Sequence, residues 1–124
     1  MISMLHILSI GIGGAIGAIA RYLLSSYNSN IPFGTFIANI LGAILIGIIF
    51  QITNEISLPS YLKPLIITGF LGALTTFSTY SLEAALMIKQ TEYTKAIVYI
   101  ALSNVLGISG VILGILFIKT FFIK

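Results

Sequence analysis

The sequence predicts an all-α membrane protein that crosses the bilayer four times. Hydrophobic residues make up 58% of its 124 positions and charged residues only 7%, whereas a soluble domain carries about 25% charged residues. Four apolar segments follow one another, each near the roughly 20 residues that a helix needs to cross ~30 Å of hydrocarbon. We expect one transmembrane domain over residues 1–124, with spans at approximately 4–24, 34–53, 62–88 and 96–118.

The connections between the spans are short and polar, and they contain residues that end helices. They read SSYNSNIP at 25–32, NEISLPSY at 54–61 and KQTEYTK at 89–95. None is long enough to separate two domains, so we expect a four-helix bundle. Small residues four positions apart let membrane helices approach closely. These pairs are Gly13 and Gly17, Ala38 and Gly42, Ala43 and Gly47, and Gly110 and Gly114.

Positive charge is divided equally between the two sides of the membrane. The six basic residues form no stripe, so nucleic-acid binding is not expected. Lys63, Lys119 and Lys124 fall on one side of a four-span chain, and Arg21, Lys89 and Lys95 fall on the other. Because Lys/Arg asymmetry sets orientation, this tie favours insertion in both directions. Two oppositely inserted copies could then pair about a two-fold axis in the membrane plane. The alternative is that the first span alone decides the orientation.

The third span contains a run of hydroxyl side chains that is unusual inside lipid. TTFSTYS at 75–81 carries six hydroxyls in seven residues. Single hydroxyls commonly bond back to the preceding helical turn, but six exceed that explanation. Gly69 and Gly72 precede the run, and glycine is where a helix unwinds most easily. We predict a break of the third helix at these glycines, where freed carbonyls can hold a cation and hydroxyls and amides can meet a small anion.

Polar residues also occur in the second and fourth spans. Asn39 lies near the middle of the second span, and Ser103 and Asn104 lie in the fourth, one turn after Tyr99. Three spans are therefore predicted to point polar groups inward. The alternative for Asn39 is a plain hydrogen bond to another helix.

Two charged residues and two aromatic residues complete the candidates. Arg21 lies near the end of the first span and either snorkels to the headgroups or raises the anion concentration at a pore mouth. Glu83 is the carboxylate inside the third span, and the sequence leaves open whether it caps, pairs with a cation or supports the helix. Phe77 and Tyr80 share a helix face, and their positive ring edges can flank an anion, although packing is the ordinary role of a Phe.

Four stretches together resemble the Fluc/CrcB family of fluoride channels. They are GGAIGAIARY (13–22), GTFIANILG (34–42), GFLGALTTFSTYSLE (69–83) and SNVLG (103–107), and they cover all four spans in order. The resemblance implies an antiparallel, dual-topology homodimer in the cell membrane of a prokaryote, with two narrow pores that passively export cytoplasmic fluoride. It also implies a structural Na⁺ on the dimer axis.

The resemblance further implies roles for individual residues. The backbone carbonyls of Gly72 and Thr75 from both subunits would ligate the Na⁺, and Arg21 would lie by the vestibule. The implied fluoride path is formed by Asn39, Phe77, Ser78, Thr79, Tyr80, Tyr99 and Ser103. The family often has Phe where this chain has Tyr80, so the ring edge is kept and a hydroxyl is added.

Two other functions compete with this hypothesis. A small multidrug-type proton antiporter also has four short spans, but it needs a titratable carboxylate, typically in the first span, and none lies between Met4 and Leu24. A non-transporting membrane subunit would use its glycines as an interface. An enzyme is least expected, because the single His6 has no cysteine or carboxylate nearby.

Overall fold

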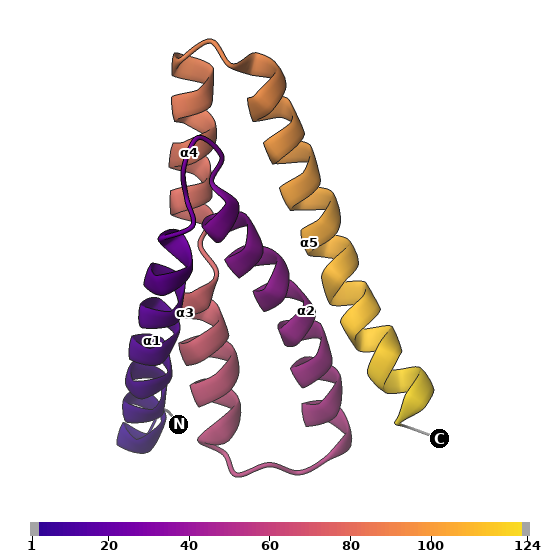
Figure 1. The fold of residues 1–124 in the computed structure, drawn as a ribbon. Helices are drawn as coiled ribbons and strands as arrows, with labels where there is room; N and C mark the ends of the chain where they lie inside the picture. The colour runs from indigo at the N-terminus through magenta and orange to yellow at the C-terminus, as the bar shows by residue number, and fades with distance from the viewer. Residues whose placement is uncertain (1–2, 123–124) are drawn as a thin grey trace.

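The chain folds into helices that run up and down between two ends of the molecule. The computed structural model describes residues 3–122. In Figure 1, the start of the first helix, the end of the last helix and the loop over residues 56–63 lie at the same end of the molecule. The elements in chain order are α1 (Met4–Ser25), α2 (Phe33–Glu55), the π-helix η1 (Pro64–Leu71), α3 (Gly72–Leu74), α4 (Phe77–Lys89) and α5 (Tyr93–Phe121).

Four helical segments are long and apolar enough to cross a membrane. They are Met4–Ser25, Phe33–Glu55, Pro64–Lys89 and Tyr93–Phe121. The third of them bends, because it joins η1, α3 and α4 through a non-helical step. The prediction of an all-α membrane fold with four spans and a broken third helix is therefore confirmed. One basic residue of the charge count, Lys124, lies outside the described residues.

Glycines let the helices pack closely along two seams. α1 packs against η1 and α3, and α2 packs against α5. A Cβ on Gly13 would collide with the carbonyl oxygen of Leu65, and a Cβ on Gly47 would collide with that of Val111. Both glycines are buried, so the predicted small-residue packing is confirmed at these positions.

The break in the third span lies three residues after the position that the sequence predicted. Gly72 is helical, with φ −63° and ψ −33°, so the prediction of a break at the glycines is wrong. Thr75 and Thr76 are extended instead, with ψ of 152° and 120°. Gly69 serves close packing, because a Cβ there would lie 2.7 Å from the carbonyl oxygen of Ile10 in α1.

Two small apolar cores lie on either side of the break. Ala38 of α2 packs with Leu71 and Leu74 before it. After it, α4 and α5 pack through a cluster that contains Met87 and Tyr99. The break is thus held between two packed regions, which allows its irregular backbone to persist at membrane depth.

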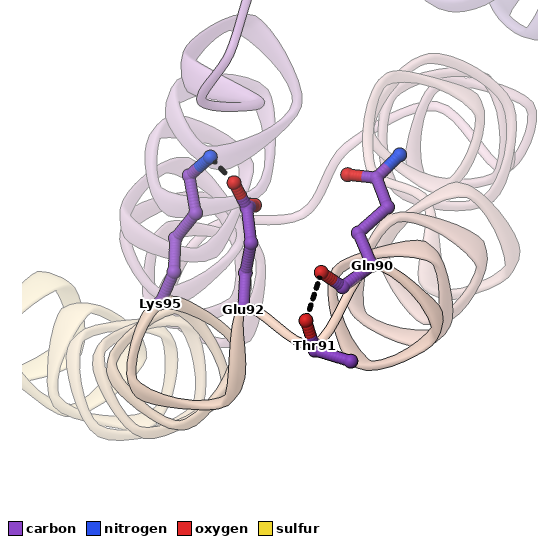
Figure 2. A network of polar contacts seen from close by, with 4 residues as sticks. All are labelled: Gln90, Thr91, Glu92 and Lys95. Atoms are coloured by element: carbon purple, nitrogen blue, oxygen red, sulfur yellow. Dashed lines mark hydrogen bonds and ion pairs between the residues drawn. The ribbon is translucent and has the colours of Figure 1, made fainter.

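A tight turn joins α4 to α5 (Figure 2). Thr91 has φ 62°, a left-handed conformation that is a genuine outlier for a β-branched residue. Its hydroxyl donates to the carbonyl of Gln90 at 2.6 Å. Lys95 then pairs with Glu92 at 2.8 Å, one turn along the start of α5.

Candidate functional site: a groove at the helix break

A groove of about 410 Å³ opens beside the helix break. Its walls come from α2, from the end of η1 through the start of α4, and from α5. Its polar lining comprises Asn39, Thr75, Thr76, Tyr80, Ser103 and Asn104, and Gly72 and Phe77 also border it. The structure therefore gathers predicted residues from three spans at one place.

Asn39 of α2 binds the backbone of the break at two points. Its Oδ1 accepts from the N–H of Thr76 at 2.7 Å, and its Nδ2 donates to the carbonyl of Thr76 at 3.1 Å. In a continuous helix that N–H would donate to the carbonyl of Gly72. Asn39 thus bonds another span, and through this bond it also stabilises the break.

The hydroxyl run divides into two groups. Thr75 donates back to the carbonyl of Leu71 at 3.0 Å, which is the ordinary behaviour of a hydroxyl in a helix. The hydroxyl of Thr76 accepts from the N–H of Thr79 at 3.1 Å and so caps α4. It also lies 3.2 Å from the hydroxyl of Ser78 and donates to that of Thr79 at 3.1 Å. The capping network gives the chain a new helix start directly after the break.

Arg21 lies on the α1 side of the break and outside the groove lining. Its Nε donates to the carbonyl of Ala73 at 2.9 Å. That carbonyl would accept from the N–H of Phe77 in a continuous helix, and the extended residues between them remove this partner. The guanidinium therefore replaces a helical hydrogen bond, a role that neither sequence interpretation of Arg21 contained.

Four aromatic rings form a row from the groove into the packed region. Phe77, Tyr80, Tyr99 and Phe36 follow one another with centroid distances of 5.7, 5.4 and 6.5 Å. Phe77 is 80% exposed, whereas Tyr99 is 6% exposed. The predicted Phe77–Tyr80 pair therefore exists at the groove, and Tyr99 lies behind Tyr80 rather than on the lining.

Glu83 is the centre of a polar network that joins three helices and a loop. Its Oε1 accepts from the hydroxyl of Thr35 at 2.7 Å and from the Nδ2 of Asn28 at 3.3 Å. Its Oε2 accepts from the phenol of Tyr99 at 2.7 Å. Asn28 also accepts from the N–H groups of Gly34 and Thr35 at the start of α2. The carboxylate therefore supports the fold, which resolves the role that the sequence left open.

The network includes two residues that the sequence analysis did not single out. Asn28 lies in the first loop and Thr35 in the first turn of α2. The sequence feature that could have identified Asn28 is its position shortly before the start of a helix, where Asn commonly caps. The signal for Thr35 was weaker, since one Thr in an apolar span is unremarkable.

Ser103 is the polar group of the groove that has no internal partner. Its Oγ is buried, and within residues 3–122 nothing hydrogen-bonds to it. A buried hydroxyl without a partner costs free energy, so this atom is a candidate for a ligand contact. Residues 3–122 contain no group of three or more His, Cys, Asp or Glu side chains that could hold a metal ion. A cation near the break would therefore depend on carbonyl and hydroxyl oxygens.

Comparison with known proteins decides the family. The family model described as "CrcB-like protein, Camphor Resistance (CrcB)" matches residues 8–115. The chain belongs to the CrcB-like family. The resemblance stated from the four sequence stretches is thus confirmed, and the CrcB-like match includes parts of all four membrane-crossing helices.

Curated relatives of this CrcB-like chain are similar over nearly their whole length. "Fluoride-specific ion channel FluC" of a Hydrogenobaculum species is 42% identical over 115 residues, covering 89% of this chain and 94% of that protein. The protein of the same name from a Nitratiruptor species is 42% identical over 118 residues, or 91% of each chain. That from Phocaeicola vulgatus is 43% identical over 117 residues, covering 90% and 97%.

These relatives are named as ion channels and not as enzymes or antiporters. Together with four apolar helices, they make this CrcB-like chain a multi-pass membrane protein. The antiporter hypothesis is further weakened by Glu83, because three hydrogen-bond donors already occupy its carboxylate.

Proposed function

We propose that this chain is a fluoride-specific ion channel that lets fluoride leave the cytoplasm passively and so lowers its toxicity. The observation that supports the proposal most strongly is the helix break. It opens a groove at membrane depth to which three spans contribute polar residues, and an amide from another span holds the break. The relatives' names supply the identity of the ion. The groove chemistry by itself favours a small anion.

The groove offers replacements for the water that a small anion must lose. The uncommitted hydroxyl of Ser103 is a hydrogen-bond donor. The exposed ring of Phe77 and the ring of Tyr80 offer positive edges, which attract an anion without holding it strongly. Our proposed fluoride path follows the groove past Asn39, Phe77, Tyr80 and Ser103. Ser78 and Thr79, which lie outside the groove lining, and Tyr99, which lies behind Tyr80, complete the proposed path, with Arg21 by the vestibule.

The channel proposed here is an antiparallel homodimer. The groove exposes Asn104 and the edge of the break, and irregular backbone is tolerated at membrane depth only where protein or an aqueous cavity covers it. A second copy related by a two-fold axis in the membrane plane would bring the same surface against itself. The even division of Lys and Arg is consistent with copies that insert in both directions.

A structural Na⁺ at the dimer axis is part of the same proposal. Carbonyl oxygens are ligands that hard cations prefer, and Gly72 and Thr75 both border the groove. The helical partner of the Gly72 carbonyl, the N–H of Thr76, is bound to Asn39. One chain would supply two carbonyls, and a second copy would double that number. The donor set therefore fits Na⁺ when two copies meet.

Reconstitution tests the function directly. Purified protein would be placed in liposomes loaded with potassium fluoride or potassium chloride, and efflux would be started with valinomycin and followed with ion-selective electrodes. We expect rapid fluoride loss and little chloride loss. Phe77→Ile should slow fluoride efflux sharply, because it removes the exposed ring edge. Phe121→Ile is the matched control, since this ring is also exposed (73%) and lies outside the groove.

Two results would overturn the proposal. One is equal loss of both anions, and the other is no fluoride loss from protein that is folded and dimeric by light scattering. If fluoride loss is absent and proton-driven dye efflux is efficient, the antiporter is favoured. No transport of any kind would favour the non-transporting subunit.

A further inference from the structure

We propose that the phenolic O–H of Tyr80 donates directly to the permeating fluoride, and that Asn104 is the positioning residue that keeps this proton free. The inference rests on the proposed channel function and adds a donor and its support to the path.

The orientation of the Asn104 amide follows from its two contacts. Its Nδ2 lies 2.8 Å from the carbonyl oxygen of Ile100 and 2.9 Å from the phenolic oxygen of Tyr80. A carbonyl oxygen can only accept, so the atom facing it must be the NH₂ nitrogen and not the amide oxygen. The same nitrogen faces Tyr80, so Asn104 donates in both contacts and Tyr80 accepts.

The phenolic proton of Tyr80 is therefore not used in its bond to Asn104. A phenol has one O–H to donate, and within residues 3–122 the contact with Asn104 is the hydrogen bond recorded for this oxygen. Donation to a hydroxyl oxygen polarises its O–H and strengthens the next hydrogen bond in the chain. Asn104 thus both directs the phenol and makes it a better donor.

The residues around Tyr80 suit an anion in the groove. Tyr80 and Asn104 both line it, as do Phe77 and Ser103. The ring of Tyr80 is fixed between Phe77 and Tyr99, at centroid distances of 5.7 and 5.4 Å. The orphan hydroxyl of Ser103 is adjacent to Asn104 in α5. Hydrogen bonds between a hydroxyl and an anion are short and strong, and fluoride is the strongest acceptor among the halides.

A purely structural tie between α4 and α5 is the competing explanation, and selectivity separates the two. Fluoride and chloride efflux would be measured from liposomes for wild type, Tyr80→Phe, Asn104→Ala and the double variant. We expect Tyr80→Phe to lower the fluoride rate about tenfold, the size of one hydrogen bond to a charged group. Chloride should not slow in parallel, so the fluoride/chloride ratio should fall. Tyr93→Phe, which removes an exposed phenol outside the groove, is the control.

The double variant tests whether Asn104 acts through Tyr80. Asn104→Ala alone should lower the same ratio by a smaller factor, and it should change nothing further when Tyr80 is already Phe, because coupled residues are not additive. Asn104→Gln, which keeps an NH₂ donor, should recover part of the ratio. The inference would be overturned by an unchanged fluoride/chloride ratio in Tyr80→Phe or by additive effects in the double variant. Either result would leave the proposed function standing, provided that the wild type conducts fluoride. A wild type that conducts no fluoride would overturn the proposed function itself.

Discussion

Asn39 and Thr76 are joined by two hydrogen bonds that cross from α2 to the break in the third span. The side-chain amide accepts from the backbone N–H at 2.7 Å and donates to the backbone carbonyl at 3.1 Å. One amide thus satisfies both polar groups of an extended residue at membrane depth. The break is therefore stabilised from outside its own helix, and its stability should depend on residue 39.

Asn39→Asp should abolish or slow fluoride efflux by more than about tenfold and lower the stability by about 1–3 kcal/mol. An ionised Asp has no donor and would face the Thr76 carbonyl with a second acceptor. The measurements are liposome efflux and thermal unfolding in detergent. Asn54→Asp, at the exposed end of the same helix, should behave as wild type. Normal fluoride flux from folded Asn39→Asp dimers would show that the site assignment is wrong.

Arg21→Lys should lower thermal stability although it keeps the positive charge. The Nε of Arg21 meets the Ala73 carbonyl at 2.9 Å, and a flexible ammonium does not reproduce this planar donor. Arg21→Gln should lose the same bond, and its efflux should also depend less on ionic strength, because the local charge that concentrates anions is gone. Wild-type stability of Arg21→Lys would mean that Arg21 acts through charge alone.

Glu83→Gln should destabilise the protein by about 1–3 kcal/mol. Three donors converge on the carboxylate of Glu83, and the NH₂ group of Gln, itself a donor, would face at least one of them. The donors are Thr35, Asn28 and Tyr99. Glu92→Gln is the matched control, since its exposed ion pair with Lys95 (Figure 2) contributes at most about 1 kcal/mol. Thermal unfolding of both variants measures the difference. Equal stability losses would contradict a structural role for Glu83.

Gly13→Ala should destabilise the fold by about 1–3 kcal/mol or prevent folding, as overpacking does. The added methyl would collide with the carbonyl oxygen of Leu65 across the seam between α1 and η1. Gly11→Ala on the same helix meets nothing within 4 Å, so it should be neutral or stabilising by up to about 1 kcal/mol. The fraction of monodisperse protein after heating distinguishes the two. Equal behaviour would argue against the seam.

Thr91→Gly should stabilise the turn between α4 and α5 by about 1 kcal/mol, because a residue with a Cβ is strained at positive φ. Thr91 has φ 62°, and its hydroxyl bond to Gln90 is on the exposed surface. Thr94→Gly, in the first turn of α5, should instead lower the stability by roughly 0.5–1 kcal/mol. A lower unfolding temperature for Thr91→Gly would show that its hydroxyl bond outweighs the strain.

The hydroxyl run is a case in which the sequence predicted a break but misplaced it. Hydroxyls and glycines in one apolar span indicated irregular backbone, and that inference was right. The break was predicted at Gly69 and Gly72 because a helix unwinds easily at glycine. Gly69 is instead needed for the close packing of η1 against α1. The break occurs at Thr75 and Thr76, because Asn39 supplies a partner to the backbone there.

The sequence by itself determined that this protein lies in lipid, how many times it crosses the membrane and to which family it belongs. Composition and the length of apolar segments are local properties, and they are sufficient because lipid permits only spans whose backbone polar groups are satisfied within the protein. Tertiary structure alone decided the place of the break and the partners of Arg21, Asn39 and Glu83. These hydrogen bonds join residues between 16 and 55 positions apart. A local pattern shows which polar groups need a partner, but only packing brings that partner within reach.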